Sequence, residues 1–279
     1  MALVASALVV ARVHRHSSDA PPRDTRPTLH TLALEAGTDK ATEHLYTLLY
    51  EPQLARWRDA TFDMLEIGVF REESLRLWDR YFRNASVYGA DRDGARGYRD
   101  SSRRSRILYC DQSKPASVRT LANYKNWSIV IDDGSHVPSH QLRTFETIFP
   151  HVMPGGLYII EDIEGSYWGD HARMYGVRLG KGNKQPNLVD TFLRSVHGAI
   201  NREFACDASL PPRVFSPRVE REMVGVAFIP NAVIITKRPA NYQRHTFYRF
   251  ADALPRPPCN TSEGERGPDI QWRRRRRRR

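Results

Sequence analysis

The sequence has few cysteines and no long apolar run. Its three cysteines, Cys110, Cys206 and Cys259, stand far apart, and no two of them have the close spacing of a zinc ligand pair. This pattern argues against a disulfide framework and against a cysteine zinc site. No apolar run approaches the roughly 20 residues that a membrane-spanning helix needs. We therefore expect no membrane span.

Acidic residues are fewer than basic residues, 32 against 43, and the formal net charge is +11. Seven of these charges belong to residues 273–279, which are consecutive arginines, and subtracting them leaves +4. A run of like charges repels itself, so we expect a disordered tail without a specific function. Weak electrostatic binding of nucleic acid or of a membrane is the alternative. No specific nucleic-acid partner is expected.

The start of the chain lacks the features of a secretory signal. "MALVASALVV" is apolar, but no positive residue precedes it, as one does in a signal peptide. The first acidic residue is Asp19, which leaves an organelle transit peptide open. We expect residues 1–30 to be a disordered or targeting segment. The expected location is the cytoplasm, with organelle targeting or secretion as alternatives.

Apolar runs and helical periodicity alternate along the middle of the chain. Strands are expected at 62–67, 87–91, 107–111, 128–133 and 157–162, and helices at 73–82, 117–124 and 138–149. Strands that alternate with helices and are apolar throughout indicate a parallel sheet covered on both faces. In the last of these helices Pro138 stands in the first turn, and "HVMPGG" is expected to separate the helix from the fifth strand.

The end of the domain has a different pattern. Two β-rich runs, 223–229 and 232–237, are separated only by "PN", which forces an antiparallel hairpin because a parallel crossover needs a dozen residues or more. The predicted fold class is α/β: a Rossmann-like, mostly parallel sheet closed by an antiparallel hairpin, as in a class I methyltransferase. The domain is expected to span 31–250, with a disordered tail at 251–279.

An insert of about 163–222 separates the fifth strand from the hairpin. One amphipathic helix is expected within it, with an apolar face made of Leu188, Phe192, Val196, Ile200 and Phe204. An insert after the fifth strand would lie above the carboxyl ends of the strands, where it could shape a substrate pocket.

Carboxylates gather at the ends of the predicted strands. In an open parallel sheet, ligands bind at this edge. Asp91 closes the second strand, where a carboxylate can accept hydrogen bonds from ribose hydroxyls, and Asp111 closes the third, near the place of an adenine amino group. A helix N-cap is the alternative for Asp91. Other candidate cofactor-binding residues at this edge are Glu66, Gly68, Ser74, Gln112 and Asp132.

Asp133, Glu161 and Asp162 follow two strands that are expected to be neighbours. Three carboxylates with open positions suit Mg²⁺, which prefers oxygen ligands. His136 stands three residues beyond Asp133, where a neutral imidazole could take a proton from a metal-activated hydroxyl. A simple turn with a capping histidine is one alternative. Another is an iron site made of His136, His140 and Asp133.

Seven segments together resemble the sugar O-methyltransferases of macrolide and rhamnosyl antibiotic biosynthesis, the group with the mycinamicin and demethylmacrocin enzymes. The segments are "GTDKATEHLYTLLYEPQL" (37–54), "LEIGVFREESLRLWDRYF" (65–82), "YGAD" (88–91), "DQS" (111–113), "IDDGSH" (131–136), "FPHVMPGGLYIIEDI" (149–163) and "SYW" (166–168). The resemblance covers roughly residues 30–170.

This resemblance implies S-adenosyl-L-methionine and Mg²⁺ as cofactors and a sugar hydroxyl as the methyl acceptor. It places the metal ligands on Asp133, Glu161 and Asp162 and the base on His136. It also implies that the segment from Thr38 to Lys40, with His44 and Tyr46, folds over the cofactor pocket. The expected partner is thus a small, glycosylated hydroxyl acceptor, and a homo-oligomer is open.

One residue departs from the family's glycine-rich turn. Glu72 stands where the family's second glycine is usual, in the pattern Glu66-x-Gly68-x-x-x-Glu72-x-Ser74. Either the turn directs Glu72 outward, or its charge weakens cofactor binding.

Two other functions stay open on the sequence. The resemblance extends to cephalosporin hydroxylases, which makes an oxidoreductase on the same scaffold one alternative. A degenerate, non-catalytic fold that binds nucleic acid through its tail and the arginines of 92–106 is the other. An intact set of Asp133, His136, Glu161 and Asp162 argues against the second alternative.

Overall fold

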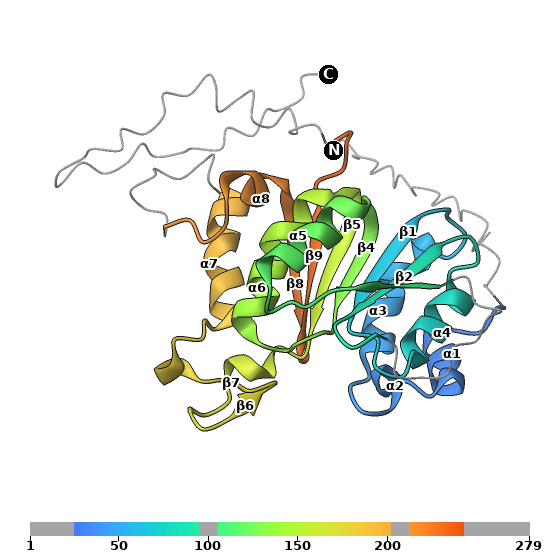
Figure 1. Cartoon of the computed structure of the whole chain (residues 1–279). Helices are drawn as coiled ribbons and strands as arrows, with labels where there is room; N and C mark the ends of the chain where they lie inside the picture. Colours follow the sequence, from blue (N-terminus) through green and yellow to red (C-terminus); the bar gives the residue numbers. More distant parts are fainter. Residues whose placement is uncertain (1–24, 95–104, 202–211, 243–279) are drawn as a thin grey trace, which may run out of the picture.

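The computed structural model describes residues 25–94, 105–201 and 212–242, and its centre is a seven-stranded sheet (Figure 1). The strand order is β3-β2-β1-β4-β5-β9-β8. The bounds are β1 (Asp63–Ile67), β2 (Ser86–Asp91), β3 (Arg106–Tyr109), β4 (Trp127–Asp132), β5 (Val152–Glu161), β8 (Met223–Ile229) and β9 (Ala232–Lys237). The first five strands run parallel, and β9 pairs antiparallel with both β5 and β8. The predicted parallel sheet with its closing hairpin is confirmed.

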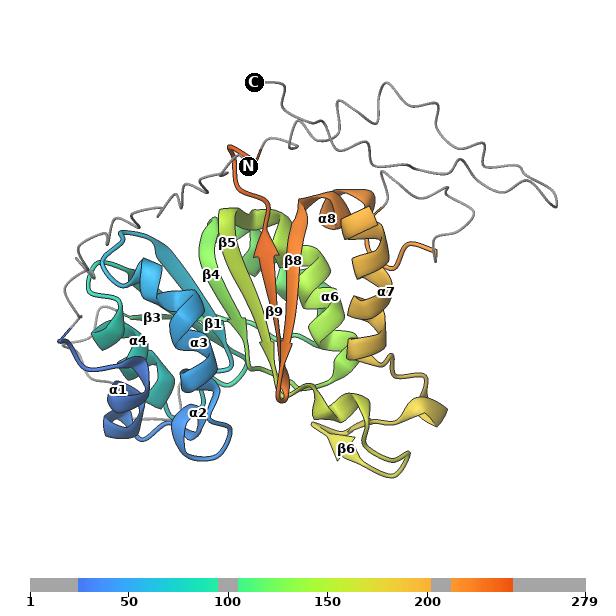
Figure 2. The same cartoon turned by 180° about the vertical axis from the view of Figure 1, so that it is seen from behind.

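Helices cover both faces of this sheet (Figures 1 and 2). One face is packed by α1 (Leu29–Ala36), α3 (Tyr46–Leu54) and α4 (Glu73–Tyr81). The other is packed by α5 (Pro115–Tyr124), α6 (Pro138–Ile148), α7 (Leu188–Asn201) and α8 (Pro217–Glu222). Among the described residues no helix is both long and apolar enough to cross a bilayer.

The strands alternate between two apolar cores. In β1, Met64 packs into the core under α4, whereas Leu65 faces the core under α6. In β4, Ile129 and Val130 divide between the two cores in the same way. Since side chains of a strand point alternately to opposite faces, a strand buried on both faces must be apolar throughout. This requirement explains the unbroken apolar runs of the sequence.

The predicted helical faces are buried for the most part. Leu75 and Trp78 in α4, Phe82 just after it, and Leu188 and Phe192 in α7 are fully buried. Leu142 in α6 and Val196 in α7 are only partly buried. The side chain of Ile200 and the whole of Phe204 fall outside the described residues, as do the predicted tail of 251–279 and residues 1–24 of the predicted segment 1–30. The last residues of that segment belong to the folded domain, because α1 begins at Leu29.

The predicted start of the fifth strand is wrong. β5 begins at Val152, five residues before Leu157. The strand therefore includes residues 152–156, which we expected to separate the preceding helix from the strand. The pairing with β4 shifts between Trp127 and Ile129, which is where Pro154 and Gly155 are accommodated. A bulge admits a proline and a glycine that a regular ladder would exclude.

Several short elements complete the fold and were not predicted. They are α2 (Asp39–Thr42), the two-stranded ribbon of β6 (Arg173–Met174) and β7 (Val177–Arg178), and the 3₁₀ helices η1 (Ala55–Trp57), η2 (Phe149–His151), η3 (Ile163–Ser166) and η4 (Lys181–Asn183). Both views place α2 and the β6–β7 ribbon at the same end of the sheet (Figures 1 and 2).

Candidate functional site

A cavity of about 600 Å³ opens at the carboxyl ends of the parallel strands. Residues of α2 and of the β6–β7 ribbon form part of its wall. Most predicted site residues line it: Thr38, Lys40, Gly68, Ser74, Asp91, Asp111, Gln112, Asp133, His136 and Asp162. Glu66, Asp132 and Glu161 are not among the lining residues, and each is at most 1% exposed.

Gly68 brings two strand ends into close approach. Its φ is +88°, and a Cβ built on it would lie 2.0 Å from the carbonyl oxygen of Asp133. Its N–H donates to the carbonyl of Ala90, and the N–H of Asp133 donates to the carbonyl of Ile67. The turn after β1 therefore packs against the turn after β4 with no room for a side chain.

The carboxylate of Asp91 is held by backbone amides. It accepts hydrogen bonds from the N–H of Val69 at 3.1 Å and from the N–H of Asp93 at 2.8 Å. The alternative of a helix N-cap is not supported, because residues 92–94, which would form the first turn of such a helix, are described and are not helical.

Asp111 is held by the turn that follows it. Its Oδ1 accepts from the N–H and the hydroxyl of Ser113, at 2.9 and 2.6 Å. Burial raises the pKa of this carboxyl, but the Ser113 hydrogen bonds and the nearby Lys114 ammonium outweigh it and lower the pKa below its ordinary value. Asp111 thus presents a negative charge to the cavity.

Glu66 lies behind the cavity wall, where it holds α4. Its Oε2 accepts from the hydroxyl of Ser74 at 2.7 Å and from Nε1 of Trp78 at 3.1 Å. Burial raises the pKa of Glu66 to about 7. We predicted direct cofactor contact for Glu66, but the structure places it one layer deeper.

Asp132 also supports the wall rather than forming it. Gln112 donates to its Oδ1 at 2.8 Å and accepts from the N–H of Ser135 at 2.7 Å. Burial raises the pKa of Asp132 to about 7. Gln112, which does line the cavity, therefore connects this buried carboxyl to the turn that carries His136.

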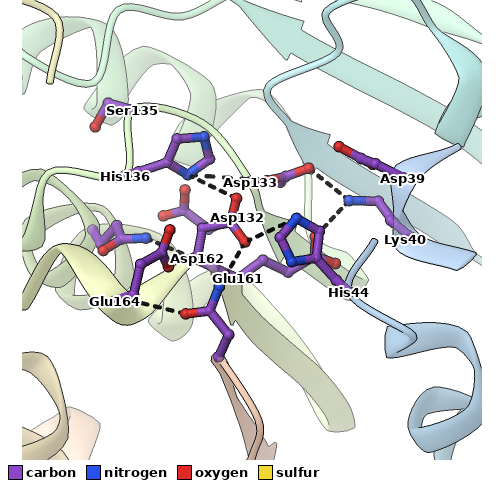
Figure 3. A network of polar contacts seen from close by, with 12 residues as sticks. Asp39, Lys40, His44, Asp132, Asp133, Ser135, His136, Glu161, Asp162 and Glu164 are labelled. Atoms are coloured by element: carbon purple, nitrogen blue, oxygen red, sulfur yellow. Dashed lines mark hydrogen bonds and ion pairs between the residues drawn. The ribbon is translucent and has the colours of Figure 1, made fainter. Parts of the chain in front are cut away.

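Asp133, His136 and Asp162 form a compact cluster at the cavity (Figure 3). One potential ligand atom from each lies within 4.8 Å of the others. Nδ1 of His136 is 3.7 Å from Oδ2 of Asp162 and 4.0 Å from Oδ1 of Asp133. This nitrogen is buried, and the structure gives it no hydrogen-bond partner among the described residues. Two carboxylates thus lie near an imidazole nitrogen that makes no hydrogen bond among the described residues.

Glu161 belongs to a second layer behind this cluster. Its Oε2 is 2.5 Å from Nζ of Lys40, and its Oε1 accepts from the hydroxyl of Tyr50 at 2.9 Å. Lys40 also donates to Oδ2 of Asp133 at 2.6 Å. The predicted metal set is therefore divided: Asp133 and Asp162 line the cavity, whereas Glu161 does not.

The segment from α2 to α3 supplies Tyr46, which the family resemblance placed at the cofactor pocket, and Tyr50, which the sequence did not indicate. Tyr50 holds Glu161, and the hydroxyl of Tyr46 donates to Oδ1 of Asp162 at 2.8 Å. The side chain of Asn231, in the β8–β9 turn, donates to the same oxygen at 3.1 Å. The two tyrosines stand four residues apart on one helix face, a spacing that could have indicated that both hydroxyls point to the same part of the molecule. Asn231 offers no such signal.

Glu72 lies outside the cavity lining, although Arg71 and Glu73 belong to it. Its side chain is 3% exposed, and its φ is +65°. This left-handed conformation favours glycine, which explains the glycine of the family pattern at this position. The side chain is thus turned neither outward to solvent, as the first of our two alternatives required, nor into the cavity; the effect on cofactor binding stays a prediction.

His140 does not join the cluster. Its Nδ1 is 3.1 Å from the hydroxyl of Ser135. Burial and then the Arg143 guanidinium lower the pKa of His140, which favours its neutral form. The arrangement among the described residues therefore gives no support to an iron site made of Asp133, His136 and His140.

The fold and the comparisons together define a class I methyltransferase fold. No family model matches the chain. A solved structure of the MycE methyltransferase from the mycinamycin biosynthetic pathway, in complex with Mg and SAH, superposes with a TM-score of 0.61 at 27% identity. That alignment covers 82% of this chain and 59% of the other. Another MycE structure, with Mg, SAH and mycinamycin VI, gives a TM-score of 0.59.

Curated relatives confirm the resemblance to sugar O-methyltransferases. The 8-demethyl-8-alpha-L-rhamnosyl tetracenomycin-C 2'-O-methyltransferase of Streptomyces olivaceus is 36% identical over 82% of this chain. The L-olivosyl-oleandolide 3-O-methyltransferase of Streptomyces antibioticus is 34% identical over 66%, and the mycinamicin VI 2''-O-methyltransferase of Micromonospora griseorubida 31% over 70%. The matches span 60%, 48% and 48% of these relatives, so the chain is similar to only part of each.

Proposed function

We propose that the chain transfers a methyl group from S-adenosylmethionine to a hydroxyl of a sugar or glycosylated natural product, with the aid of Mg²⁺. The observation that carries this proposal is the cluster of Asp133, His136 and Asp162 at the edge of a glycine-walled cavity. The named reactions of the relatives supply the substrate class.

The cavity fits the cofactor in shape and in polarity. Gly68 lines the cavity, and the absence of a Cβ lets the turn after β1 pack against the turn that carries Asp133, so that both turns form one wall. Asp91 and Asp111 keep carboxylate oxygens at the ends of β2 and β3, where the hydroxyls of a ribose and the amino group of an adenine would donate to them. Thr38, Ser74 and Gln112 complete the proposed contacts, and Glu66 and Asp132 support them from behind.

The cluster fits a divalent cation. Asp133 and Asp162 offer carboxylate oxygens, which Mg²⁺ prefers, and the buried Nδ1 of His136 lies beside them without a hydrogen bond. Glu161 lies behind Asp133 and is paired with Lys40. We propose Asp133 and Asp162 as the direct ligands, with Glu161 able to join them only if it leaves Lys40 or Tyr50.

The chemistry needs a base for the acceptor hydroxyl. When bound, S-adenosylmethionine supplies the methyl group, and the cation makes a nearby hydroxyl more acidic. His136 is the proposed base, because its ring borders both the cavity and the two carboxylates. Asp133 and Asp162 would stabilise the imidazolium that forms when the ring takes the proton. The β6–β7 ribbon and α2 would exclude water and orient the acceptor.

Isothermal titration with S-adenosylmethionine, with and without Mg²⁺, tests cofactor binding. Transfer of a labelled methyl group to glycosylated polyketides and simple rhamnosides, in Mg²⁺ or in EDTA, tests the reaction. We expect turnover that depends on Mg²⁺. Absence of cofactor binding under both conditions would contradict the proposal.

His136→Ala separates chemistry from binding. We expect S-adenosylmethionine affinity to stay close to that of the wild type and turnover to fall by roughly 10²- to 10⁴-fold, the usual contribution of a positioned base. Asp162→Asn is the comparison, because it should instead raise the Mg²⁺ concentration required. Wild-type turnover in His136→Ala would remove the histidine from the mechanism.

Compartment and assembly stay predictions. A cytoplasmic location and a homo-oligomer are compatible with such an enzyme. The alternative of nucleic-acid binding through arginines concerns residues of which 95–104 and 243–279 lie outside the described part of the chain.

A further inference from the structure

Lys40 stands among carboxylates in a way that sequence alone did not indicate. Its side chain is 1% exposed, and its Nζ is 2.5 Å from Oε2 of Glu161, 2.6 Å from Oδ2 of Asp133 and 3.4 Å from Oε1 of Glu66. Three carboxylates surround this ammonium, so the geometry places a positive charge inside the site.

The position of this ammonium overlaps the role of a divalent cation. Asp133 gives one oxygen to Lys40, while its other oxygen faces the cavity cluster with His136 (Figure 3). Glu161 gives one oxygen to Lys40 and the other to Tyr50. Two of the three carboxylates that the sequence suggested for Mg²⁺ are thus paired with a single lysine from α2.

We propose that Lys40 is a built-in counter-cation, which keeps the carboxylates of β4 and β5 assembled when no metal is bound and competes with the divalent cation for Asp133 and Glu161. This inference rests on the metal site of the proposed function. It assigns to Lys40 a positioning role, distinct from the contact with S-adenosylmethionine that the sequence suggested.

The competition follows from charge in either possible coordination. If Glu161 joins the metal ligands, the cation must take oxygens that Lys40 now holds. If Glu161 stays behind the cluster, the cation binds to Asp133 beside a positive charge that repels it. In both cases, removal of the ammonium should increase metal affinity, because like charges at this separation repel strongly where water is excluded.

Lys237 offers a matched control. It is also buried, at 5% exposure, and its Nζ is 2.6 Å from Oε2 of Glu222 and 2.8 Å from the carbonyl oxygen of Phe149. It lies on β9, and neither it nor Glu222 lines the cavity. Lys237→Gln therefore removes a buried, paired lysine without altering the charge of the candidate metal site.

The test is the affinity for Mn²⁺, used as a paramagnetic probe in place of Mg²⁺ and measured by electron paramagnetic resonance. We expect Lys40→Gln to bind Mn²⁺ roughly tenfold more tightly or better. The wild type and Lys237→Gln should bind alike. Equal or weaker binding by Lys40→Gln would overturn the counter-cation role and leave the proposed methyl transfer standing. If neither the wild type nor Lys40→Gln bound Mn²⁺, this inference and the metal site of the proposed function would fail together.

A second measurement decides the case in which Lys40→Gln does not fold without metal. Thermal unfolding is then compared in EDTA and in excess Mg²⁺. A counter-cation predicts that Mg²⁺ restores a cooperative transition to Lys40→Gln, because the metal replaces the missing charge. A purely structural lysine predicts no rescue, as for Lys237→Gln, and that outcome would overturn the proposal.

Discussion

Several residues at or beside the cavity, among them Glu72, His136 and Asp162, hold backbone conformations that side chains usually avoid. The φ angles of Glu72, His136 and Asp162 are +65°, +50° and +53°. Each such angle costs about 1–2 kcal/mol for a residue with a Cβ. His136 and Asp162 are both in the candidate metal cluster, where this geometry turns the imidazole and the carboxylate towards each other. Strain that collects in a polar cluster is typical of a site under functional constraint.

Gly68 should tolerate no side chain. Gly68→Ala combines a left-handed conformation, about 1–2 kcal/mol, with overpacking against Asp133, about 1–3 kcal/mol. We expect a lower free energy of unfolding and loss of cofactor binding. Gly37→Ala is the control, since its φ is +76° but a Cβ would meet nothing within 4 Å. Denaturant unfolding of both variants measures the difference. Equal losses would contradict the close approach of the two turns.

Asp132 should make stability depend on pH. Its folded pKa is about 7, above the ordinary 3.8, so the folded protein keeps a proton that the unfolded chain has lost. Its stabilising contribution is therefore complete below about pH 4 and is lost as the pH rises to about 7. Asp132→Asn cannot ionise, and its Oδ1 can still accept from Gln112.

Urea unfolding at several pH values across this window measures the difference between Asp132→Asn and the wild type. The variant should gain stability relative to the wild type as the pH rises. Parallel curves would mean that Asp132 ionises normally in the folded protein.

The sequence predicted the cavity edge better than the contacts behind it. Asp133, His136 and Asp162 were found because they follow neighbouring strands, and a parallel sheet brings such ends together. The pairing of Lys40 with Glu161 joins residues 121 positions apart, and the pairing of Tyr46 with Asp162 depends on how α3 packs. No local pattern encodes contacts of that kind.

At the scale of the element, periodicity identified the long strands and helices. It missed α1 to α3, where exposed leucines such as Leu34 and Leu48 weaken the amphipathic pattern. It also misplaced the start of β5, because the bulge admits Pro154 and Gly155 into the strand. Tertiary packing, rather than local propensity, decides both cases.

The β6–β7 ribbon is the element that we expect to contact the acceptor. Tyr175 and Gly176 form its turn with φ angles of +46° and +80°, a turn that favours asparagine or glycine over tyrosine. Tyr175 is nevertheless 60% exposed, lines the cavity and lies under the guanidinium of Arg92, 5.5 Å from its ring centroid. An exposed aromatic ring in a strained turn suits contact with a ligand.

Tyr175→Asn should keep the turn and remove the ring. We expect the KM for the acceptor to rise roughly two- to tenfold, the value of one aromatic contact, with little change in S-adenosylmethionine affinity. Steady-state kinetics and titration calorimetry separate the two effects. A change in cofactor affinity alone would place the ring over the cofactor instead.

At the scale of the whole molecule, the chain corresponds to only part of its relatives. It spans 60% or less of the length of the curated methyltransferases reported above. The described part nevertheless contains the sheet, both helical layers and the complete candidate cluster. Binding of S-adenosylmethionine and of the cation should therefore be measurable on this chain.

Residues 273–279 contribute seven of the eleven net positive charges, and they lie outside the described residues. Because a run of arginines repels itself, its deletion should leave the melting temperature and methyl transfer unchanged. The deletion should lower any affinity for nucleic acid and flatten its dependence on salt, since fewer counterions are released. Calorimetry and filter binding at several salt concentrations measure both effects. A loss of several degrees in melting temperature would mean that the arginines dock on the domain, which would contradict their interpretation as a tail without a folded role.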